Sequence, residues 1–335
     1  MAAPLEERIA ADADPANAAD PAELHTSVML DRCLELLAPV ASRPGAVVVD
    51  GTLGMGGHSA ALLAAHPGLT LVGLDRDLDA LELAGRRLSP FGDRAVLVHT
   101  VYDGIAEAVR GAGLDRIDGV LFDLGVSSLQ LDEADRGFAY AQDAPLDMRM
   151  DQSSGETAAD VLREAPEGRL RAIFERYGEE PLAARYARAI VAARGEAPIE
   201  RSGRLVEVLQ AATPAAVRDQ RHPAKRVFQA LRIEVNGELA ALERAIPAAL
   251  DLLNVGGRAV VMSYQSLEDR LVKREFARRS KSTAPAGLPV ELPEHRPEFA
   301  LLTRGAEQAG EAERSANPRA IPVRLRAVER LREAS

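Results

Sequence analysis

The sequence has few of the features that mark secreted, membrane or metal-binding proteins. It contains one cysteine, Cys33, which excludes an internal disulfide, and its six histidines lack the spacing of metal ligands. No apolar run is long enough to span a bilayer, and the amino terminus lacks the basic-then-apolar order of a secretory signal. We therefore expect a cytoplasmic protein with no metal and no membrane partner.

Lysine is also scarce, because Lys225, Lys273 and Lys281 are the only lysines among 41 basic residues. The net charge of −10 argues against a protein that coats nucleic acid through its overall field. From Arg163 to Arg232, however, 14 basic residues face 9 acidic ones, an excess of 14 − 9 = 5. This excess is either a local basic face or a compositional preference for arginine, and the sequence leaves both interpretations open.

The stretch Ala46-Val47-Val48-Val49-Asp50-Gly51-Thr52-Leu53-Gly54-Met55-Gly56-Gly57-His58-Ser59 has the layout of a nucleotide site. A β-branched run predicts a buried parallel strand that ends at a carboxylate, and a glycine-dense turn leads into a helical pattern from Ser59 to Ala65. Glycines let a ligand approach the backbone, and the helix start offers unpaired N–H groups.

The spacing of these glycines disfavours a dinucleotide. The only G-x-G-x-x-G frame begins at Gly54 and ends at Ser59 instead of glycine. Asp50 would oppose a pyrophosphate but suits the cationic amino-acid end of S-adenosylmethionine, and Asp75, after the strand Leu69 to Leu74, is placed to accept hydrogen bonds from a ribose. A nicotinamide oxidoreductase and a turn without a ligand remain the alternatives.

Alternating strands and helices predict an α/β fold with a doubly wound, mostly parallel sheet. Further strands are expected at 95–99 and 119–122, with helices at 78–88 and 105–110. The loop Asp123 to Ser128 should share a crevice with Gly56 and Asp75, because ligands of such sheets lie beyond the carboxyl ends of the strands.

The strand pattern then stops, and helical patterns predict an inserted all-helical domain over residues 133–236. Within it we expect helices that include Leu170 to Tyr177, Leu182 to Ile190 and Leu205 to Leu209, the last capped by Ser202. The core should comprise residues 23–132 and 237–335, after a disordered tail over 1–22. Segments 280–297 and 304–318 should be mobile in part.

The second part of the core should begin with a helix at 239–253 and a glycine turn at 254–257. A strand at 258–263 should then lead into a loop, Tyr264 to Arg270, that points into the crevice. Phe299 to Leu302 and Val323 to Val328 should form an antiparallel hairpin.

Taken together, these motifs resemble the bacterial small-subunit ribosomal RNA cytidine-N4 methyltransferases, the RsmH or MraW family. The matching motifs run in order along the chain and include His25-Thr26-Ser27-Val28-Met29-Leu30, Asp50 to Ser59, Phe122 to Ser128, Arg136-Gly137-Phe138, Pro145 to Asp151, Tyr177-Gly178-Glu179-Glu180, His222 to Ile233, Ser266-Leu267-Glu268-Asp269-Arg270 and Asn317-Pro318-Arg319-Ala320. The resemblance implies a Rossmann-like methyltransferase core, S-adenosylmethionine as methyl donor and a decoding-site cytidine of 16S rRNA in the small (30S) subunit as acceptor.

The resemblance also implies site residues. The cofactor contacts that it carries over are Gly56, Gly57, His58, Asp75, Tyr102, Asp123 and Gln130. Tyr264-Gln265 departs from the Phe-His usual in the family, as do Tyr102, Leu129 and Ile321-Pro322-Val323 from their family residues, and Gln265 cannot act as a general base.

The acceptor amine of cytosine is a poor nucleophile, so alignment and acceptors for its N–H groups should matter more than a strong base. We expect Asp123 or carbonyls near Leu124, with Tyr264, Gln265 and Ser266, to frame a flipped base. Tyr264 is either a stacking residue or an ordinary wall of the crevice.

Basic residues from the matching motifs are the candidate RNA contacts. These are Arg149, Lys225, Arg226 and Arg232, with solvated helix faces as the alternative. A homodimer is a further expectation. The competing functions are a non-catalytic S-adenosylmethionine-binding assembly factor, a methyltransferase acting on another RNA and, less favoured, a small-molecule methyltransferase.

Overall fold

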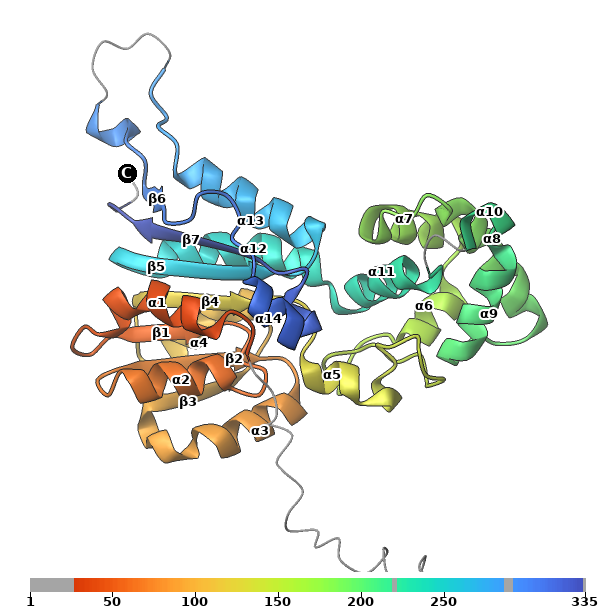
Figure 1. Cartoon of the computed structure of the whole chain (residues 1–335), viewed down its shortest axis with the longest axis horizontal. Coiled ribbons are helices and arrows are strands. Elements are labelled where there is room, and N and C mark those ends of the chain that lie inside the picture. Colours follow the sequence, from red (N-terminus) through yellow and green to blue (C-terminus); the bar gives the residue numbers. More distant parts are fainter. Residues whose placement is uncertain (1–26, 219–221, 286–291, 334–335) are drawn as a thin grey trace, which may run out of the picture.

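A seven-stranded, mostly parallel sheet organises the protein in a computed structural model that describes residues 27–218, 222–285 and 292–333 (Figure 1). The strand order is β3-β2-β1-β4-β5-β7-β6, and the strands are β1 (Val47–Asp50), β2 (Thr70–Asp75), β3 (Ala95–His99), β4 (Ile117–Asp123), β5 (Leu253–Ser263), β6 (Phe299–Leu301) and β7 (Arg324–Arg330). Strands β1 to β5 pair in parallel, and β7 pairs antiparallel with β5 and β6. The expected α/β fold with a doubly wound sheet is confirmed.

Helices cover both faces of this sheet. One buried cluster joins α1 (Leu30–Ala41), α2 (Gly57–Ala65) and α3 (Leu78–Leu88) to one face, and Cys33 lies inside it as a small apolar side chain. A second cluster joins α4 (Ile105–Gly111), α12 (Glu238–Leu252) and α13 (Ser266–Arg279) to the other face. Because β-strand side chains alternate, Val48 faces the first cluster and Val49 the second.

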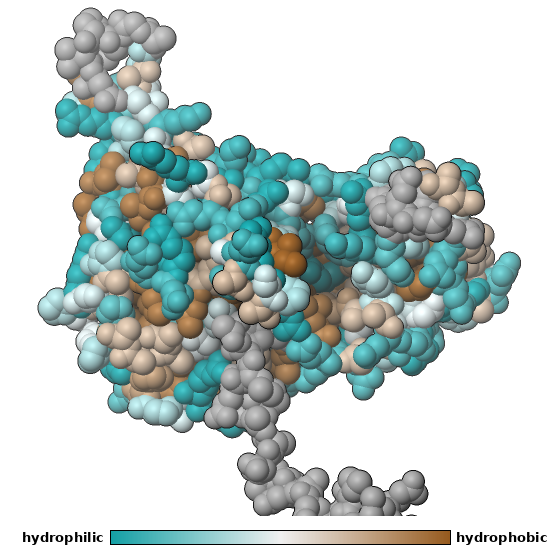
Figure 2. Space-filling model, in the orientation of Figure 1, coloured by the Kyte–Doolittle hydropathy of each residue, from teal (hydrophilic) through white to brown (hydrophobic). Residues whose placement is uncertain are grey.

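The chain between β4 and α12 is helical, as the pattern predicts, and has its own buried cluster. After α5 (Ser128–Asp132) and a long loop it contains α6 (Ala158–Glu164), α7 (Glu167–Gly178), α8 (Ala183–Glu196), α9 (Ser202–Ala212), α10 (Ala215–Arg218) and α11 (Ala224–Asn236). These helices stand beside the sheet, and mainly hydrophilic residues cover their visible surface (Figures 1 and 2). We call this part the helical insert; its exact limits as a folding unit, 133 and 236, remain a prediction.

Three local expectations differ from the structure. Ser202 is the first residue of α9, so it does not precede that helix as its cap. The turn expected at 254–257 belongs to β5, which starts at Leu253 and shifts register between its pairs with Ile117 and Gly119. The loop expected at 264–270 is short, because α13 already begins at Ser266. The partial mobility expected at 304–318, which includes α14 (Glu311–Ala316), stays a prediction, and the expected disordered tail 1–22 lies outside the described residues.

The end of β2 is bonded directly to the helical insert. Arg76 donates to the Asn236 carbonyl at the end of α11 (2.7 Å). The Asn236 side chain accepts from the Met150 N–H (2.8 Å) and donates to the carbonyls of Met148 (2.7 Å) and Arg232 (2.9 Å). Asn236 therefore connects α11, the loop at 148–150 and, through its carbonyl, the sheet.

Replacing Asn236 with alanine should destabilise the fold by about 2 to 3 kcal/mol, because buried backbone groups of Met148 and Met150 would lose their partner. Urea denaturation measures the change in the free energy of unfolding. Gln210→Ala, at an exposed position of α9, is the control and should change it by less than about 0.5 kcal/mol. Equal stabilities of the two variants would contradict the connecting role of Asn236.

Candidate active site

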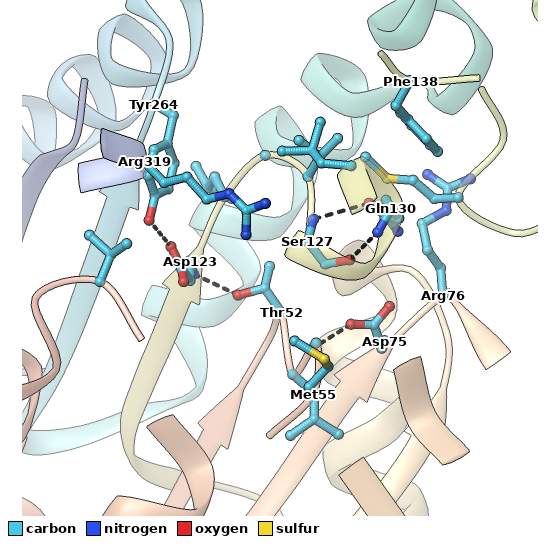
Figure 3. Close-up of a pocket in the computed structure, with 18 of the residues that line it drawn as sticks. Thr52, Met55, Asp75, Arg76, Asp123, Ser127, Gln130, Phe138, Tyr264 and Arg319 are labelled. Carbon is cyan, nitrogen blue, oxygen red and sulfur yellow. Dashed lines mark hydrogen bonds between the residues drawn. The ribbon is translucent and has the colours of Figure 1, made fainter. Parts of the chain in front are cut away.

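The carboxyl ends of β1, β2 and β4 open into a cavity of about 460 Å³, which also reaches the helical insert (Figure 3). Most of the expected site residues line it. These are Gly57, His58, Asp75, Tyr102, Asp123, Gln130, Tyr264, Gln265, Lys225 and Arg232. Gly56, Ser266, Arg149 and Arg226 are not among the lining residues.

The glycine turn after β1 is fixed from both sides. Gly51 lies so close to the Phe122 ring that a Cβ would overlap it, and Gly56 has φ 75°, a conformation that favours glycine. The Gly56 backbone starts α2 and packs against Ala84 and Leu88, behind the cavity wall. Gly56 therefore shapes the turn, whereas Gly57 and His58 border the cavity.

Asp50 does not lie where the sequence predicts, at the amino-acid end of a ligand. Asp50 is 2% exposed, does not line the cavity, and accepts hydrogen bonds from the Ser59 hydroxyl (2.6 Å) and the Thr52 N–H (3.2 Å). It thus braces the turn from behind, and direct contact with the amino-acid end of a ligand is not its role. Burial raises its pKa.

The carboxylate of Asp75, by contrast, borders the cavity at the end of β2. Its two oxygens accept from the N–H groups of Asp77 (2.9 Å) and Gly54 (2.7 Å), so its position is fixed (Figure 3). Burial raises its pKa to about 6. Each oxygen retains a lone pair, which suits the carboxylate to accept from a vicinal diol.

At the end of β4, Asp123 forms the centre of a polar cluster. Its Oδ1 accepts from the Tyr264 hydroxyl (2.7 Å), and its backbone N–H donates to the Thr52 hydroxyl (2.5 Å). The buried His58 lies with Nε2 3.0 Å from the Val28 carbonyl and Nδ1 3.9 Å from Asp123 Oδ2. Since a carbonyl only accepts, Nε2 carries a hydrogen, and Nδ1 faces the carboxylate. Burial raises the pKa of Asp123.

The start of α13 places the neighbouring polar groups. Glu268, 3% exposed, accepts with one oxygen from the N–H groups of Tyr264 (3.0 Å) and Gln265 (3.1 Å). The Gln265 side-chain oxygen is buried and has no hydrogen-bond partner among the described residues, although the side chain borders the cavity. This oxygen has almost no accessible surface and faces the Glu268 N–H across the capping box that starts α13, so it can meet a donor from a ligand only after its side chain turns toward the cavity. A buried acceptor without a donor is costly, which favours such a turn. Ser266 points elsewhere, toward Glu179 (3.2 Å).

Two expected cofactor residues are themselves held by neighbours. Gln130, 4% exposed, accepts from the Ser127 N–H (3.1 Å) and donates to Asp77 (2.9 Å), so both ends of its amide are engaged (Figure 3). Tyr102 donates from its hydroxyl to the Glu238 carbonyl (3.0 Å) and meets Phe122 edge to face with ring centres 6.0 Å apart. Both contribute shape to the cavity wall.

The expected RNA contacts differ in their availability. Arg149 is paired with Asp147 (2.8 Å), and Arg232 makes two bonds to Glu238 (2.8 and 2.9 Å). Arg226 donates to the Glu179 carbonyl (2.6 Å) outside the cavity. Lys225 is exposed at the start of α11 and borders the cavity.

The structure adds lining residues that the sequence reasoning missed. Among them are Ser27, Arg76, Arg87, Phe138, Tyr140 and Arg319. Ser27, Phe138 and Arg319 stand in motifs that carried the family resemblance, which could have identified them, whereas Tyr140, Arg76 and Arg87 had no such signal. The Arg76 Nε is buried, with no partner among the described residues.

Residues 27–218, 222–285 and 292–333 contain no group of three or more His, Cys, Asp or Glu side chains that could hold a metal ion. None of the helices in these ranges is long and apolar enough to cross a membrane.

The strand order, with its cavity at the ends of β1, β2 and β4, defines a Rossmann-like methyltransferase of the S-adenosylmethionine-dependent class. The model of the MraW methylase family matches residues 22–331, and the chain belongs to this family. The resemblance inferred from the motifs is confirmed.

Relatives and solved structures resemble the chain to different degrees. Ribosomal RNA small subunit methyltransferase H from Leifsonia xyli subsp. xyli is 69% identical over 310 residues, covering 92% of this chain and 95% of the relative. The protein of the same name from Saccharopolyspora erythraea is 67% identical over 311 residues, covering 92% and 94%. A crystal structure of an rRNA methylase from Streptococcus thermophilus aligns with a TM-score of 0.42 at 15% identity, covering 92% of this chain and 99% of that one.

Glu268 generates a pH-dependent prediction for stability. Burial raises its pKa from 4.5 to about 7, so its contribution to folding is fully present below pH 4.5 and is lost as the pH rises toward 7. Glutamine stays neutral, and its amide oxygen can still accept from Tyr264 and Gln265. Between pH 5 and pH 8, the stability of Glu268→Gln relative to the natural protein should therefore improve by up to about 3 kcal/mol. Urea denaturation of both proteins at both pH values measures the difference in their free energies of unfolding. A difference that does not change with pH would contradict the prediction.

Proposed function

We propose that this protein methylates the exocyclic N4 amine of a decoding-site cytidine in 16S rRNA, within the small ribosomal subunit in the cytoplasm, with S-adenosylmethionine as donor. Family membership and the names of its relatives support ribosomal RNA of the small subunit as the acceptor. The observation that carries the choice of an amine is the Asp123 carboxylate, an acceptor that lines the cavity and is fixed by Tyr264, with Gln265 beside it. The decoding-site location follows from the motif resemblance.

The cavity fits the proposed cofactor. Asp75 presents fixed acceptors for the two ribose hydroxyls, and Gly57 and His58 border the space beside the glycine turn. Tyr102 offers an aromatic edge, and the carboxylates of Asp50, Asp75 and Asp123 give this end of the sheet a negative field that suits a sulfonium. When bound, S-adenosylmethionine supplies an electrophilic methyl group.

The protein's own residues then orient the acceptor. The N4 lone pair of cytosine is delocalised into its ring, so the amine gains nucleophilicity as its nitrogen pyramidalises. The Asp123 carboxylate, and Gln265 Oε1 once its side chain turns toward the cavity, can each accept from an N–H of the amine and favour that change. Tyr264 donates to Asp123, which fixes the carboxylate and places the tyrosine ring beside it (Figure 3). Burial raises the pKa of Asp123, which suits this carboxylate to receive the amine proton.

The four candidate RNA contacts differ in how readily each can reach a phosphate. Lys225 is exposed at the cavity and can meet a phosphate directly, and Arg226 follows it on α11. Arg149 and Arg232 would first have to leave Asp147 and Glu238. We therefore expect Lys225 to matter most of the four for RNA affinity.

Incubation with isotopically labelled S-adenosylmethionine and small ribosomal subunits from a strain lacking the protein tests the function. Digestion of the RNA should yield labelled N4-methylcytidine from one position. Label in another nucleoside or another RNA would favour a different methyltransferase activity. Cofactor binding without any label would favour a non-catalytic assembly factor.

The acceptor role of Gln265 predicts that Gln265→Ala lowers kcat on these subunits by roughly 10-fold, because one hydrogen bond to the amine is lost at the moment of reaction. Its affinity for S-adenosylmethionine, measured by calorimetric titration, should stay unchanged. Gln265→Glu retains a side-chain oxygen and should keep more activity than the alanine variant. The control is Gln210→Ala, which removes an exposed amide of α9. If Gln265→Ala kept the full kcat, the amide would not face the reacting amine.

A further inference from the structure

The chain between β6 and β7 brings an arginine to the cavity that the mechanism above does not use. Arg319 lies in a short 3-10 turn, Pro318–Ala320, and borders the cavity together with Pro322. The Asn317 side chain accepts from the Arg319 N–H (3.1 Å) and fixes the start of the turn. Figure 3 shows the Arg319 side chain extending from beside Tyr264 toward the region between Asp123 and Ser127.

The backbone that carries Arg319 is firmly attached to the core. Glu307 makes two bonds to Arg32 of α1 (2.8 and 3.0 Å), and Glu313 of α14 accepts from the Met29 N–H (2.6 Å). Ala320, the neighbour of Arg319, is fully buried. The position of the Arg319 Cα is therefore set by the fold, and its side chain reaches out from a rigid base.

The Arg319 side chain contacts the opposite rim. Its guanidinium donates to Asp132 (2.7 Å), the last residue of α5, which follows the end of β4. The two side chains are 39% and 66% exposed. An exposed pair of this kind contributes little to stability and is screened by salt, so its partner can be exchanged at small cost.

A phosphate is the natural competitor for this arginine. The guanidinium fork matches phosphate and carboxylate alike, and a backbone phosphodiester carries one negative charge, as the Asp132 carboxylate does. A strand of RNA presents several such phosphates at once, which favours the exchange. A base that enters the cavity from a strand of RNA brings its flanking phosphates to the cavity mouth. Lys225 of α11 supplies a basic group from the helical insert, and Arg319 supplies one from the carboxyl-terminal part of the chain.

We propose that Arg319 binds a backbone phosphate of the RNA beside the target nucleotide, an inference that rests on the proposed function. Asp132 holds the Arg319 side chain in place until the phosphate replaces Asp132 as its partner. The two residues then have opposite effects on RNA binding. Arg319 attracts the strand, whereas Asp132 competes with it for the same guanidinium.

Four proteins test this inference: the natural chain, Arg319→Gln, Asp132→Asn and the double variant. Their dissociation constants for small ribosomal subunits lacking the modification are measured over a range of salt concentrations. Arg319→Gln should weaken binding about 10-fold and reduce the slope of log K against log salt by about one. Asp132→Asn should tighten binding two- to fivefold at low salt, and the double variant should behave as Arg319→Gln. Affinity for S-adenosylmethionine should be the same in all four.

A purely structural ion pair would give a different pattern, because both single variants would then weaken binding. That result would overturn the inference, as would an unchanged affinity and salt slope for Arg319→Gln while the natural chain still methylates the subunits. Weakened binding of S-adenosylmethionine by Arg319→Gln would assign the arginine to the cofactor instead. Glu82→Gln breaks a comparable exposed pair with Arg86 on α3 and serves as the control with unchanged affinity. If the natural chain failed to methylate the subunits, that result would contradict the proposed function itself, and with it this inference, which rests on that function.

Discussion

The site depends on three carboxylates at the carboxyl ends of neighbouring parallel strands, of which Asp50 is buried and Asp75 and Asp123 are half-buried. Asp50, Asp75 and Asp123 end β1, β2 and β4, and parallel pairing brings those ends to one edge of the sheet. Burial raises the pKa of each, in the case of Asp75 to about 6. Carboxylates withdrawn from water need hydrogen-bond donors around them. The Gly54 N–H of the glycine turn, the Ser59 hydroxyl and the Tyr264 hydroxyl supply these donors.

The same strand end that faces the cavity also holds the helical insert. In β2 and just beyond it, Asp75 borders the cavity, Arg76 bonds to Asn236, and Asp77 pairs with the buried Arg136 at 2.7 Å. Arg136 in turn donates to the Met150 carbonyl (2.9 Å). Three consecutive residues thus connect the proposed cofactor side of the cavity to the part of the chain that covers its acceptor side. A buried pair such as Asp77 with Arg136 is costly to break singly, since the remaining charge would lack a partner.

The elements of the core could be predicted because their signals are local. The β-branched run before Asp50, the alternation of strands and helices and the shift to helical periodicity after β4 all depend on neighbouring residues. The extent of β5 and the early start of α13 were missed, because glycines at 256 and 257 resemble a turn and Tyr264-Gln265 resembles a loop in isolation. Tertiary pairing with β4 and a cap from Glu268 decide those two cases.

The site could be predicted less well than the fold, for reasons of charge pairing. Arginine looks the same in a sequence whether its charge meets solvent or a carboxylate. Arg149 is neutralised by Asp147, two positions earlier, and Arg232 by Glu238, which begins the next helix. The motif containing Arg319 was recognised, but its place at the cavity arises only when the carboxyl-terminal segment attaches to α1 through Glu307 and Glu313. The cavity is therefore complete only where the two ends of the described chain lie together, and a contact of such sequence separation leaves no local signal in the sequence and carries a large loop-closure cost.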